Sequence, residues 1–321
     1  MNLRRLVADV GGTRSRFGVS DGPGRLSEIR IYETAARPTF AGTMAAYLAD
    51  IGAEPAGAAW CRDVRVAAAG PVDAGTVRLT NSAWQISAEE ISRDFGGVPV
   101  VLVNDLEAVG LLLPHLTPAD TKPVGSATMV PPGAGLVGNR IAVNIGTGFG
   151  AATAVRSISD KSGTRWTIAA GEAGHMTLAA VTPEEAAALA FAHSVEDVLS
   201  GAGVSRLYEA VASTTNDHRT ANAVFAGAAS DPFAAVTVQI LSRLLGRIAG
   251  DLVLATASWD GVYLCGTVAQ TWAGVGDTAA FRAEFERKGA MSARMAKVPA
   301  HVITAAEPAL LGLSYADAES G

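Results

Sequence analysis

The sequence predicts an α/β protein made of two domains that share one plan, and three observations lead to this. A chain of 321 residues is longer than one small hydrophobic core requires and suits two domains of ordinary size. An apolar strand that runs into a glycine turn occurs twice, at residues 6–13 and 141–148. Each of these units is followed by two further predicted strands, so the order of elements repeats although the residue identities differ.

The first third of the chain predicts a three-stranded meander followed by a helix. The strands cover residues 3–10, 16–20 and 28–33, with tight turns at 11–12 and 21–24, and the helix covers 39–51. Short strands follow at 65–69 and 76–80. A second helix begins after Ser87, which forms a capping box with Glu90. Residues 99–103 read as a buried strand that stops at Asn104 and Asp105, where a third helix begins.

The segment 117–139 is rich in Pro, Gly and Thr, and we place the domain boundary there. The expected domains are residues 1–116 and 117–321, with the last helix returning to the first domain as an open alternative. In the second domain we expect strands at 141–145, 150–155 and 165–169, helices at 183–192, 204–212 and 232–257, and a strand at 261–265 that ends in a third glycine turn at Gly266.

Composition excludes several classes of protein. With 49% hydrophobic and 17% charged residues the chain is globular, and a net charge of −6 with scattered Lys and Arg argues against nucleic acid or anionic membrane as partners. The two cysteines cannot build a disulfide framework or a thiolate metal cluster, which fits a reducing cytosol. The start shows no signal-peptide character, and three charged residues interrupt the apolar region 233–257, which therefore reads as a buried helix.

The two glycine turns suit the phosphates of a nucleotide. Glycine lets the backbone approach an oxyanion and leaves amide groups free to donate to it, and Thr13 and Thr147 add hydroxyl donors. Asp9 supplies a carboxylate that could hold a magnesium ion through water. The plainer alternative is that each is an ordinary chain-reversing turn.

Asp105 is the strongest catalytic candidate. A carboxylate at the carboxyl end of a buried strand lies at the edge where α/β sheets bind ligands, and it can accept a proton from a substrate hydroxyl. An Asp directly before a helix is also a common N-cap, and the two roles are compatible.

Further polar candidates lie in small-residue segments. Glu172 and His175 are three residues apart and can bind neighbouring hydroxyls, although a surface turn with two solvated side chains is the alternative. The pair has too few ligands for structural zinc. Glu196 reads first as an acidic residue at a helix start, and Asn81 reads as a turn residue near Trp84.

Taken together, the motifs resemble those of bacterial glucokinases, in order and spacing and over nearly the whole chain. They comprise Asp9-Val10-Gly11-Gly12-Thr13, Thr80-Asn81 with Trp84, Asn104-Asp105, Gly146-Thr147-Gly148, Gly171-Glu172-Ala173-Gly174-His175, Glu196 with Val198-Leu199-Ser200-Gly201, Gly266, and Pro308-Ala309-Leu310-Leu311-Gly312.

The resemblance implies an actin-like ATPase fold of two ribonuclease-H-like α/β domains with an interdomain cleft. It implies transfer of the ATP γ-phosphoryl group to the 6-hydroxyl of glucose, with Mg2+ as cofactor. Asp105 would be the general base, and Asn81, Asn104, Asp105, Glu172, His175 and Glu196 would bind the sugar. The nucleotide would be bound by Ala8, Asp9, Val10, Gly11, Gly12, Thr13, Gly146, Thr147, Gly148 and Gly266.

Three features depart from that family. Arg14 stands where the family usually has asparagine, and Thr267 stands where a second glycine usually follows Gly266. Both changes bear on nucleotide binding if the turns need a positive φ. The chain also lacks the cysteine cluster that holds zinc in the related repressor and sugar kinase group, which leaves His175 for sugar.

Some alternatives stay open at this point. The chain could be a kinase for another hexose or an amino sugar, or a sugar-binding regulator that has lost turnover. The phosphoryl donor is ATP by resemblance, with GTP and polyphosphate as competitors. A homodimer is one assembly open to such a chain.

Overall fold

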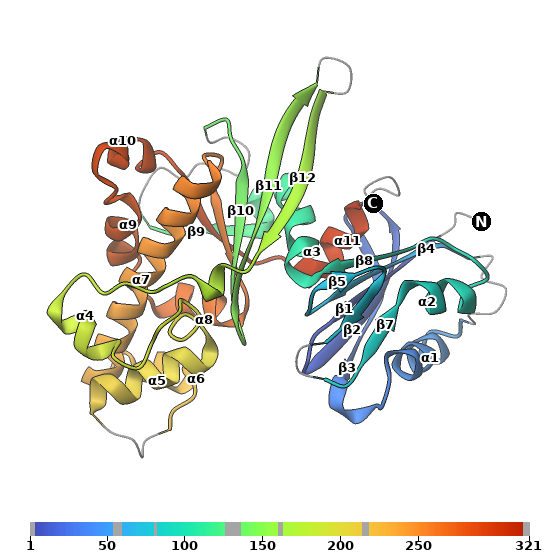
Figure 1. Ribbon diagram of the computed structural model, residues 1–321, viewed down its shortest axis with the longest axis horizontal. Coiled ribbons are helices and arrows are strands. Elements are labelled where there is room, and N and C mark those ends of the chain that lie inside the picture. Colours follow the sequence, from blue (N-terminus) through green and yellow to red (C-terminus); the bar gives the residue numbers. More distant parts are fainter. Residues whose placement is uncertain are drawn as a thin grey trace. The chain divides into compact units, whose positions relative to one another are not determined.

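The computed structural model describes residues 4–53, 60–79, 82–125, 136–159, 163–213 and 218–316. These divide into two compact units (Figure 1). The first combines residues up to Leu112 with those from Ala306 onward, and the second runs from Leu113 to Ala305. The first unit is therefore discontinuous in sequence, and the boundary expected after residue 116 lies four residues beyond Leu112.

A five-stranded mixed sheet forms the centre of the first unit. Its strands are β1 (Arg4–Val10), β2 (Arg14–Gly22), β3 (Arg25–Glu33), β4 (Cys61–Ala68) and β8 (Val100–Asn104), in the order β3-β2-β1-β4-β8. The first three pair antiparallel as the predicted meander. β4 and β8 join parallel, so β1, β4 and β8 end at one edge of the sheet.

Two helices cover one face of this sheet. They are α1 (Phe40–Asp50) and α2 (Ala88–Asp94), and their apolar side chains pack against the even-numbered residues of β1 and β4 in one core. The Thr39 hydroxyl accepts from the Gly42 amide and caps α1, and the Ser87 hydroxyl accepts from the Glu90 amide and caps α2. A small sheet of β5 (Val72–Asp73), β6 (Thr76–Arg78) and β7 (Gln85–Ser87) precedes α2.

The other face of the sheet carries α3 (Asp105–Leu112) and α11 (Pro308–Tyr315), which pack on each other. Arg5 of β1 donates to the carbonyl oxygens of Leu313 and Ser314, so the end of the chain is fastened to its first strand. A Cβ atom at Gly312 would lie 1.8 Å from the Ala108 carbonyl oxygen. The close approach of the two helices therefore requires glycine at this position.

The second unit has a six-stranded sheet. Its strands are β9 (Thr121–Pro123), β10 (Arg140–Ile145), β11 (Phe149–Ser159), β12 (Gly163–Gly171), β13 (Val262–Cys265) and β14 (Ala300–Ile303), in the order β12-β11-β10-β13-β14-β9. β10, β11 and β12 pair antiparallel, and β13 and β14 join parallel to β10. Apart from the added β9, this is the strand order of the first unit, which confirms the predicted repeat.

Seven α-helices accompany that sheet among the described residues: α4 (Pro183–Ala188), α5 (Gly201–Ala212), α6 (Ala221–Gly227), α7 (Pro232–Thr256), α8 (Thr267–Val275), α9 (Thr278–Glu286) and α10 (Ser292–Met295). α7 is the longest and packs against α5, α6 and α9. Its residues Leu241, Leu244 and Leu245 are at most 2% exposed, as expected of a buried helix. Within the described part of the chain, no single helix is long and apolar enough to cross a membrane; α6 and α7 pass that test only as a pair, which is bent by 111°.

The sequence did not predict every element. The short 3₁₀ turns lie at Thr34–Ala36, Leu113–His115, Pro118–Asp120, Ala173–His175 and Gly289–Met291. Helices α6, α8, α9 and α10 and strands β5, β7, β9 and β14 were not predicted. The glycine turn expected after Gly266 is instead the start of α8.

Candidate active site

The first glycine turn connects β1 to β2 and is tied to the end of β3. The Gly11 amide donates to the Arg14 carbonyl oxygen at 3.0 Å. Thr34, which is fully buried, donates its hydroxyl to the Gly11 carbonyl oxygen at 2.8 Å and its amide to the Thr13 carbonyl oxygen at 2.9 Å. Neither Gly11 nor Gly12 has a positive φ. Thr34 therefore fixes the turn, a role that no local sequence signal indicates.

Asp9 lies on β1 just before this turn. Burial raises the pKa of its carboxyl to about 6; Arg16 opposes that shift, and the carboxylates of Asp105 and Glu307 reinforce it. The Arg16 guanidinium lies 3.3 Å from Asp9 Oδ2 and 2.8 Å from Glu307 Oε2. Asp9 and Glu307 thus share one cation near the carboxyl end of β1.

This excess of negative charge fits a divalent cation. Mg2+ binds oxygen ligands and commonly uses one or two carboxylates together with waters and substrate phosphates. In the described ranges no cluster of three or more His, Cys, Asp or Glu side chains could hold a metal by itself. The Asp9 carboxylate is an oxygen ligand of the kind that magnesium takes together with waters and phosphates.

Asn104 and Asp105 stand where β8 passes into α3, at the sheet edge where β1 also ends. The Asn104 Oδ1 and Asp105 Oδ1 atoms both accept from the Leu106 amide, at 2.9 and 3.0 Å. Asp105 is the first residue of α3, and Asn104 before it accepts from the second helical amide, so the N-cap alternative for Asp105 is wrong. Asp105 is half-buried in the first unit.

The second glycine turn connects β10 to β11. The Gly146 amide donates to the Gly148 carbonyl oxygen at 3.0 Å, and the Gly146 carbonyl oxygen accepts from the Gly201 amide at 2.8 Å, which fixes the turn beside the start of α5. The Thr147 side chain is exposed. The turn thus combines an exposed hydroxyl with a helix N-terminus, a combination that suits an anion.

Gly266 ends β13 next to this turn, because β10 and β13 are parallel neighbours. Its φ is +90° and a Cβ atom here would lie 2.4 Å from the Ile145 carbonyl oxygen. Only glycine fits. Thr267 is the first residue of α8 and has no such constraint, so its departure from the family pattern needs no left-handed conformation. Arg14 is exposed at the start of β2.

Glu196 proves to be a central residue of the second unit. Its Oε2 atom accepts from the Phe149 amide at 2.7 Å, just beyond the second glycine turn. Cβ atoms at Gly148 and Gly174 would lie 2.5 and 3.3 Å from the same oxygen. The helix-start interpretation of Glu196 is wrong, because α5 begins at Gly201 with Ser200 as its cap.

Glu172 directly precedes the short 3₁₀ turn Ala173–His175, and His175 is its last residue. The His175 amide donates to the Glu172 carbonyl oxygen at 3.1 Å, and both side chains are exposed. The Glu196 amide donates to the Gly174 carbonyl oxygen at 2.9 Å. The structure therefore brings the second glycine turn, Glu196 and this pair together, from three separate stretches of sequence.

Asn81 and Thr80 lie outside the described residues. The neighbouring Trp84 is buried, and its indole donates to the Arg37 carbonyl oxygen at 3.0 Å. Trp84 is thus part of the core beside α1.

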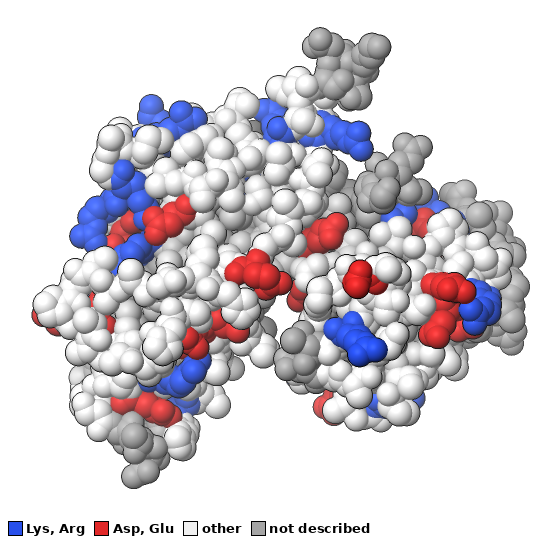
Figure 2. All heavy atoms as spheres, in the orientation of Figure 1, with Lys and Arg blue, Asp and Glu red and all other residues white. Residues whose placement is uncertain are grey.

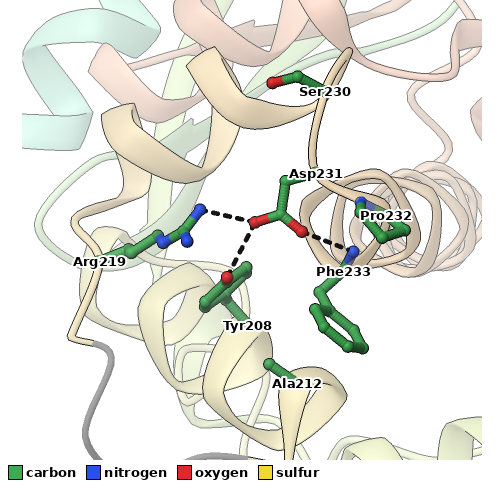
Figure 3. Close-up of a pocket in the computed structure, with 7 residues that line it drawn as sticks. All are labelled: Tyr208, Ala212, Arg219, Ser230, Asp231, Pro232 and Phe233. Atoms are coloured by element: carbon green, nitrogen blue, oxygen red, sulfur yellow. Dashed lines mark hydrogen bonds and ion pairs between the residues drawn. The ribbon is translucent and has the colours of Figure 1, made fainter.

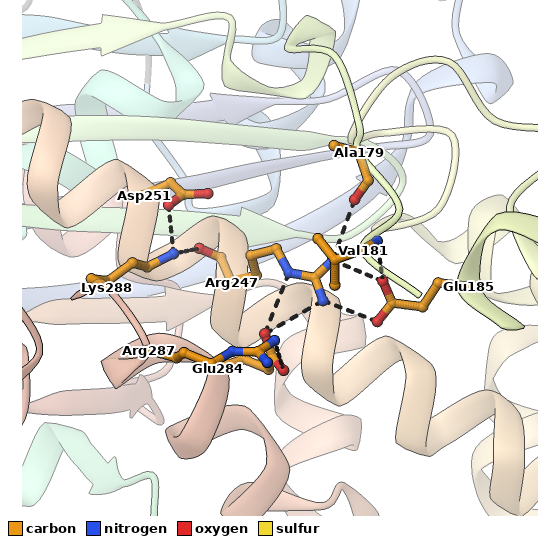
Figure 4. Close-up of polar contacts among 8 residues, drawn as sticks. All are labelled: Ala179, Val181, Glu185, Arg247, Asp251, Glu284, Arg287 and Lys288. Carbon is orange, nitrogen blue, oxygen red and sulfur yellow. Dashed lines mark hydrogen bonds and ion pairs between the residues drawn. The ribbon is translucent and has the colours of Figure 1, made fainter. Parts of the chain in front are cut away.

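An ion-pair network fastens the segment that follows His175 (Figure 4). Arg247 of α7 donates to both carboxylate oxygens of Glu185, at 2.9 and 3.0 Å, and to the Ala179 carbonyl oxygen at 3.3 Å. Glu185 Oε2 also accepts from the Val181 amide at 3.0 Å. Arg247 pairs in addition with Glu284 of α9. Residues 179–185 are thus fixed to two helices of the core.

A pocket of the second unit is lined by other residues. Its volume is about 580 Å³, and its lining residues are Tyr208, Ala212, Arg219, Ser230, Asp231, Pro232 and Phe233 (Figure 3). In it, Arg219 and Tyr208 both bind the Asp231 carboxylate, at 2.6 and 2.9 Å. That carboxylate also caps α7 through the Phe233 amide at 2.8 Å. These contacts are structural, and none of the predicted site residues lines this pocket.

Lys and Arg are scattered over the surface visible in Figure 2, as the sequence leads us to expect. On the face shown in Figure 2, Lys and Arg lie in several separate groups that alternate with Asp and Glu. Many are paired, as Arg4 is with Asp21 and Arg93 with Glu89.

Comparisons with known proteins agree with one another. The sequence model of the family described as Glucokinase matches residues 6–320. The chain is 35% identical to the glucokinase of Aromatoleum aromaticum over 97% of this chain and 94% of that protein. It is 33% identical to the bifunctional protein glk of Burkholderia thailandensis, with 98% of this chain covered. The chain spans about half the length of that relative, at 48%.

Solved structures show the same fold. A glucokinase from an Antarctic psychrotroph has a TM-score of 0.78 and 27% identity, covering 97% of this chain and 98% of that one. A glucokinase of the repressor and sugar kinase (ROK) family from Streptomyces griseus, solved with glucose and AMPPNP, has a TM-score of 0.64 and 22% identity, covering 97% and 98%. The described α/β units therefore have the predicted actin-like ATPase fold.

Proposed function

The chain belongs to the glucokinase family, and from that premise we propose that it transfers the γ-phosphoryl group of ATP to the 6-hydroxyl of D-glucose. The observation that carries this proposal is the family match over residues 6–320 together with an intact Asp105 directly after β8. The Streptomyces griseus relative binds glucose and an ATP analogue, which supports both substrates.

In the proposed reaction Asp105 accepts the proton of the 6-hydroxyl while that oxygen attacks the γ-phosphorus. The bond from the γ-phosphorus to the bridging oxygen breaks, and ADP leaves with the electron pair. The position of Asp105 directly after β8, at the sheet edge where β1 also ends, supports this role. We propose Asn81, Asn104, Glu172, His175 and Glu196 as further glucose ligands.

We propose that the nucleotide phosphates are bound by the two glycine turns, residues 8–13 and 146–148, with Gly266 next to the adenosine. The exposed Thr147 and the start of α5 support this assignment in the second unit. Mg2+, held by Asp9 through water, would supply positive charge to the phosphoryl oxygens. The carboxylate charge around Asp9 supports that position.

We propose that the two units are the domains expected from the sequence and that the enzyme works in the cytoplasm, where ATP is available. A homodimer is the assembly that we propose to test first. Size-exclusion chromatography with light scattering distinguishes a monomer of 32.7 kDa from a dimer.

A coupled assay tests the proposed activity. Glucose, other hexoses and amino sugars are each offered with ATP, GTP or polyphosphate, and product formation is followed. We expect kcat/KM to be highest for glucose with ATP. A higher value for another sugar would make the chain a kinase for that sugar, and glucose binding without turnover would make it a regulator.

A further inference from the structure

Arg16 joins two carboxylates that lie far apart in the sequence. It stands on β2 directly opposite Asp9 of β1, and its guanidinium is 3.3 Å from Asp9 Oδ2. The same guanidinium is 2.8 Å from Glu307 Oε2, at the start of α11. All three side chains are between 18% and 28% exposed, so water screens these contacts only in part.

Asp9 is held on one side only. Its Oδ2 atom contacts Arg16, whereas no described residue donates to its Oδ1 atom. The guanidinium also lies closer to Glu307 than to Asp9, by the distances above. Glu307 thus shares the guanidinium as an ion pair, while Asp9 contacts it through Oδ2 alone.

The backbone of Glu307 is unusual. Its φ and ψ are 49° and 58°, in the left-handed region that residues with a side chain seldom adopt. Glu307 occupies the N-cap position of α11, yet its side chain makes no capping hydrogen bond. The carboxylate is thus directed to Arg16 and not to its own helix, and strained residues of this kind are concentrated at functional sites.

We infer that Arg16 and Glu307 are positioning residues for Asp9, which they hold by Oδ2 so that Oδ1 stays available to a water of the magnesium–nucleotide complex. This inference rests on the proposed function. It predicts that removing the charge of Glu307 frees Arg16 to pair more fully with Asp9, which then competes with the metal-bound water.

Binding of Mn2+·ADP tests the inference without turnover. Its Kd is measured by calorimetry, with electron paramagnetic resonance of the bound Mn2+, for wild type, Glu307→Gln, Arg16→Lys and the double variant. We expect each single change to raise the Kd about fivefold, within the range for residues of one ion-pair network, and the double variant to be no weaker than the weaker single variant. The Kd for glucose alone should stay within about twofold of wild type, because neither Arg16 nor Glu307 is among the proposed sugar ligands.

Two further variants serve as controls for the effect of Glu307→Gln on Mn2+·ADP binding. Asp21→Asn removes an exposed carboxylate that pairs with Arg4 on the same sheet, and it should leave the Mn2+·ADP affinity unchanged. Glu307→Asn lacks the carboxylate but tolerates the left-handed backbone, so it should weaken binding as Glu307→Gln does while keeping the fold.

The outcomes separate the two claims. An unchanged Kd in Glu307→Gln and Glu307→Asn, or an equal change in Asp21→Asn, would overturn the inference while glucose phosphorylation by wild type stands. Additive effects in the double variant would also overturn it, because they would mean that Arg16 and Glu307 act independently. A wild type that binds Mn2+·ADP but phosphorylates no sugar would instead refute the proposed function.

Discussion

Asp105 concentrates the proposed chemistry in one side chain. We expect Asp105→Asn to lower kcat at least a hundredfold, the usual contribution of a general base being about 10² to 10⁴, while glucose binding stays within about tenfold. The amide keeps the shape and can still accept from the Leu106 amide, but it cannot take the proton. Steady-state kinetics and glucose titration measure both quantities. Turnover above a tenth of wild type would exclude Asp105 as the base.

The exposed pair Glu172 and His175 is a second prediction at this scale. We expect Glu172→Ala and His175→Ala each to raise the KM for glucose about tenfold or more and the KM for ATP by less than about twofold, because a charged hydrogen bond contributes about 1.5 to 3 kcal/mol. His193→Ala, another exposed histidine of the same unit, is the matched control. If both KM values rise equally, the pair supports the fold and not the sugar.

Among the elements, the start of α8 depends on one glycine. We expect Gly266→Ala to destabilise the protein by about 2 kcal/mol or more, because a φ of +90° is strained for alanine and the new Cβ would meet the Ile145 carbonyl oxygen. Gly274→Ala in the same helix, where nothing lies within 4 Å, should instead be neutral or stabilise by up to about 1 kcal/mol. Chemical unfolding measures both, and similar values for the two variants would contradict this account.

The link between α4 and α7 has a pH signature. Burial alone would raise the pKa of Glu185, but hydrogen bonds from Arg247 and the Val181 amide lower it below its usual value. A lowered pKa means that the native state binds fewer protons than the unfolded chain, so this stabilisation is complete at neutral pH and is lost as the pH falls.

We therefore expect Glu185→Gln to reduce the free energy of unfolding by about 1 to 3 kcal/mol at pH 7. The difference from wild type should shrink below the usual Glu pKa of about 4.3. Urea unfolding of both proteins between pH 7 and a pH below about 4.3 measures the difference in the free energy of unfolding. The adjacent Glu184 is exposed, and Glu184→Gln should show no such dependence. A difference that is constant with pH would mean that the charge of Glu185 is not what stabilises the network.

The elements that local patterns could predict were those with long periodic or apolar runs, such as the meander and α7. β9 and β14 pair with each other although about 180 residues separate them, and each is too short to show a period. α9 mixes charged and aromatic residues in a way that gives no clear period, and it packs on α7. Similarly, Glu196 could be chosen as a candidate from the sequence, but its contact with the Phe149 amide could not be predicted. The ion pair of Arg16 with Glu307 could not be predicted either.

At the scale of the whole molecule, the stability of the first unit depends on α11, which packs on α3 and on one face of the sheet. We expect Gly312→Ala to destabilise that unit by about 1 to 3 kcal/mol, because the added methyl group collides with the Ala108 carbonyl oxygen. Hydrogen exchange should become faster in β1 and β4 and stay unchanged in β10 and β13, with Gly274→Ala as the control. Faster exchange in all four strands would show that the two units unfold as one.

The discontinuity of the first unit also sets the order of events during synthesis. Domains generally fold as they emerge from the ribosome, those nearer the N-terminus first. Here β1 to β8 emerge first, but α11, which covers one face of their sheet, is made only after all of residues 113–305. The second unit, which is continuous, can therefore complete its core while the nascent first unit still exposes that face, and this interval is when the chain is most open to chaperones and to aggregation.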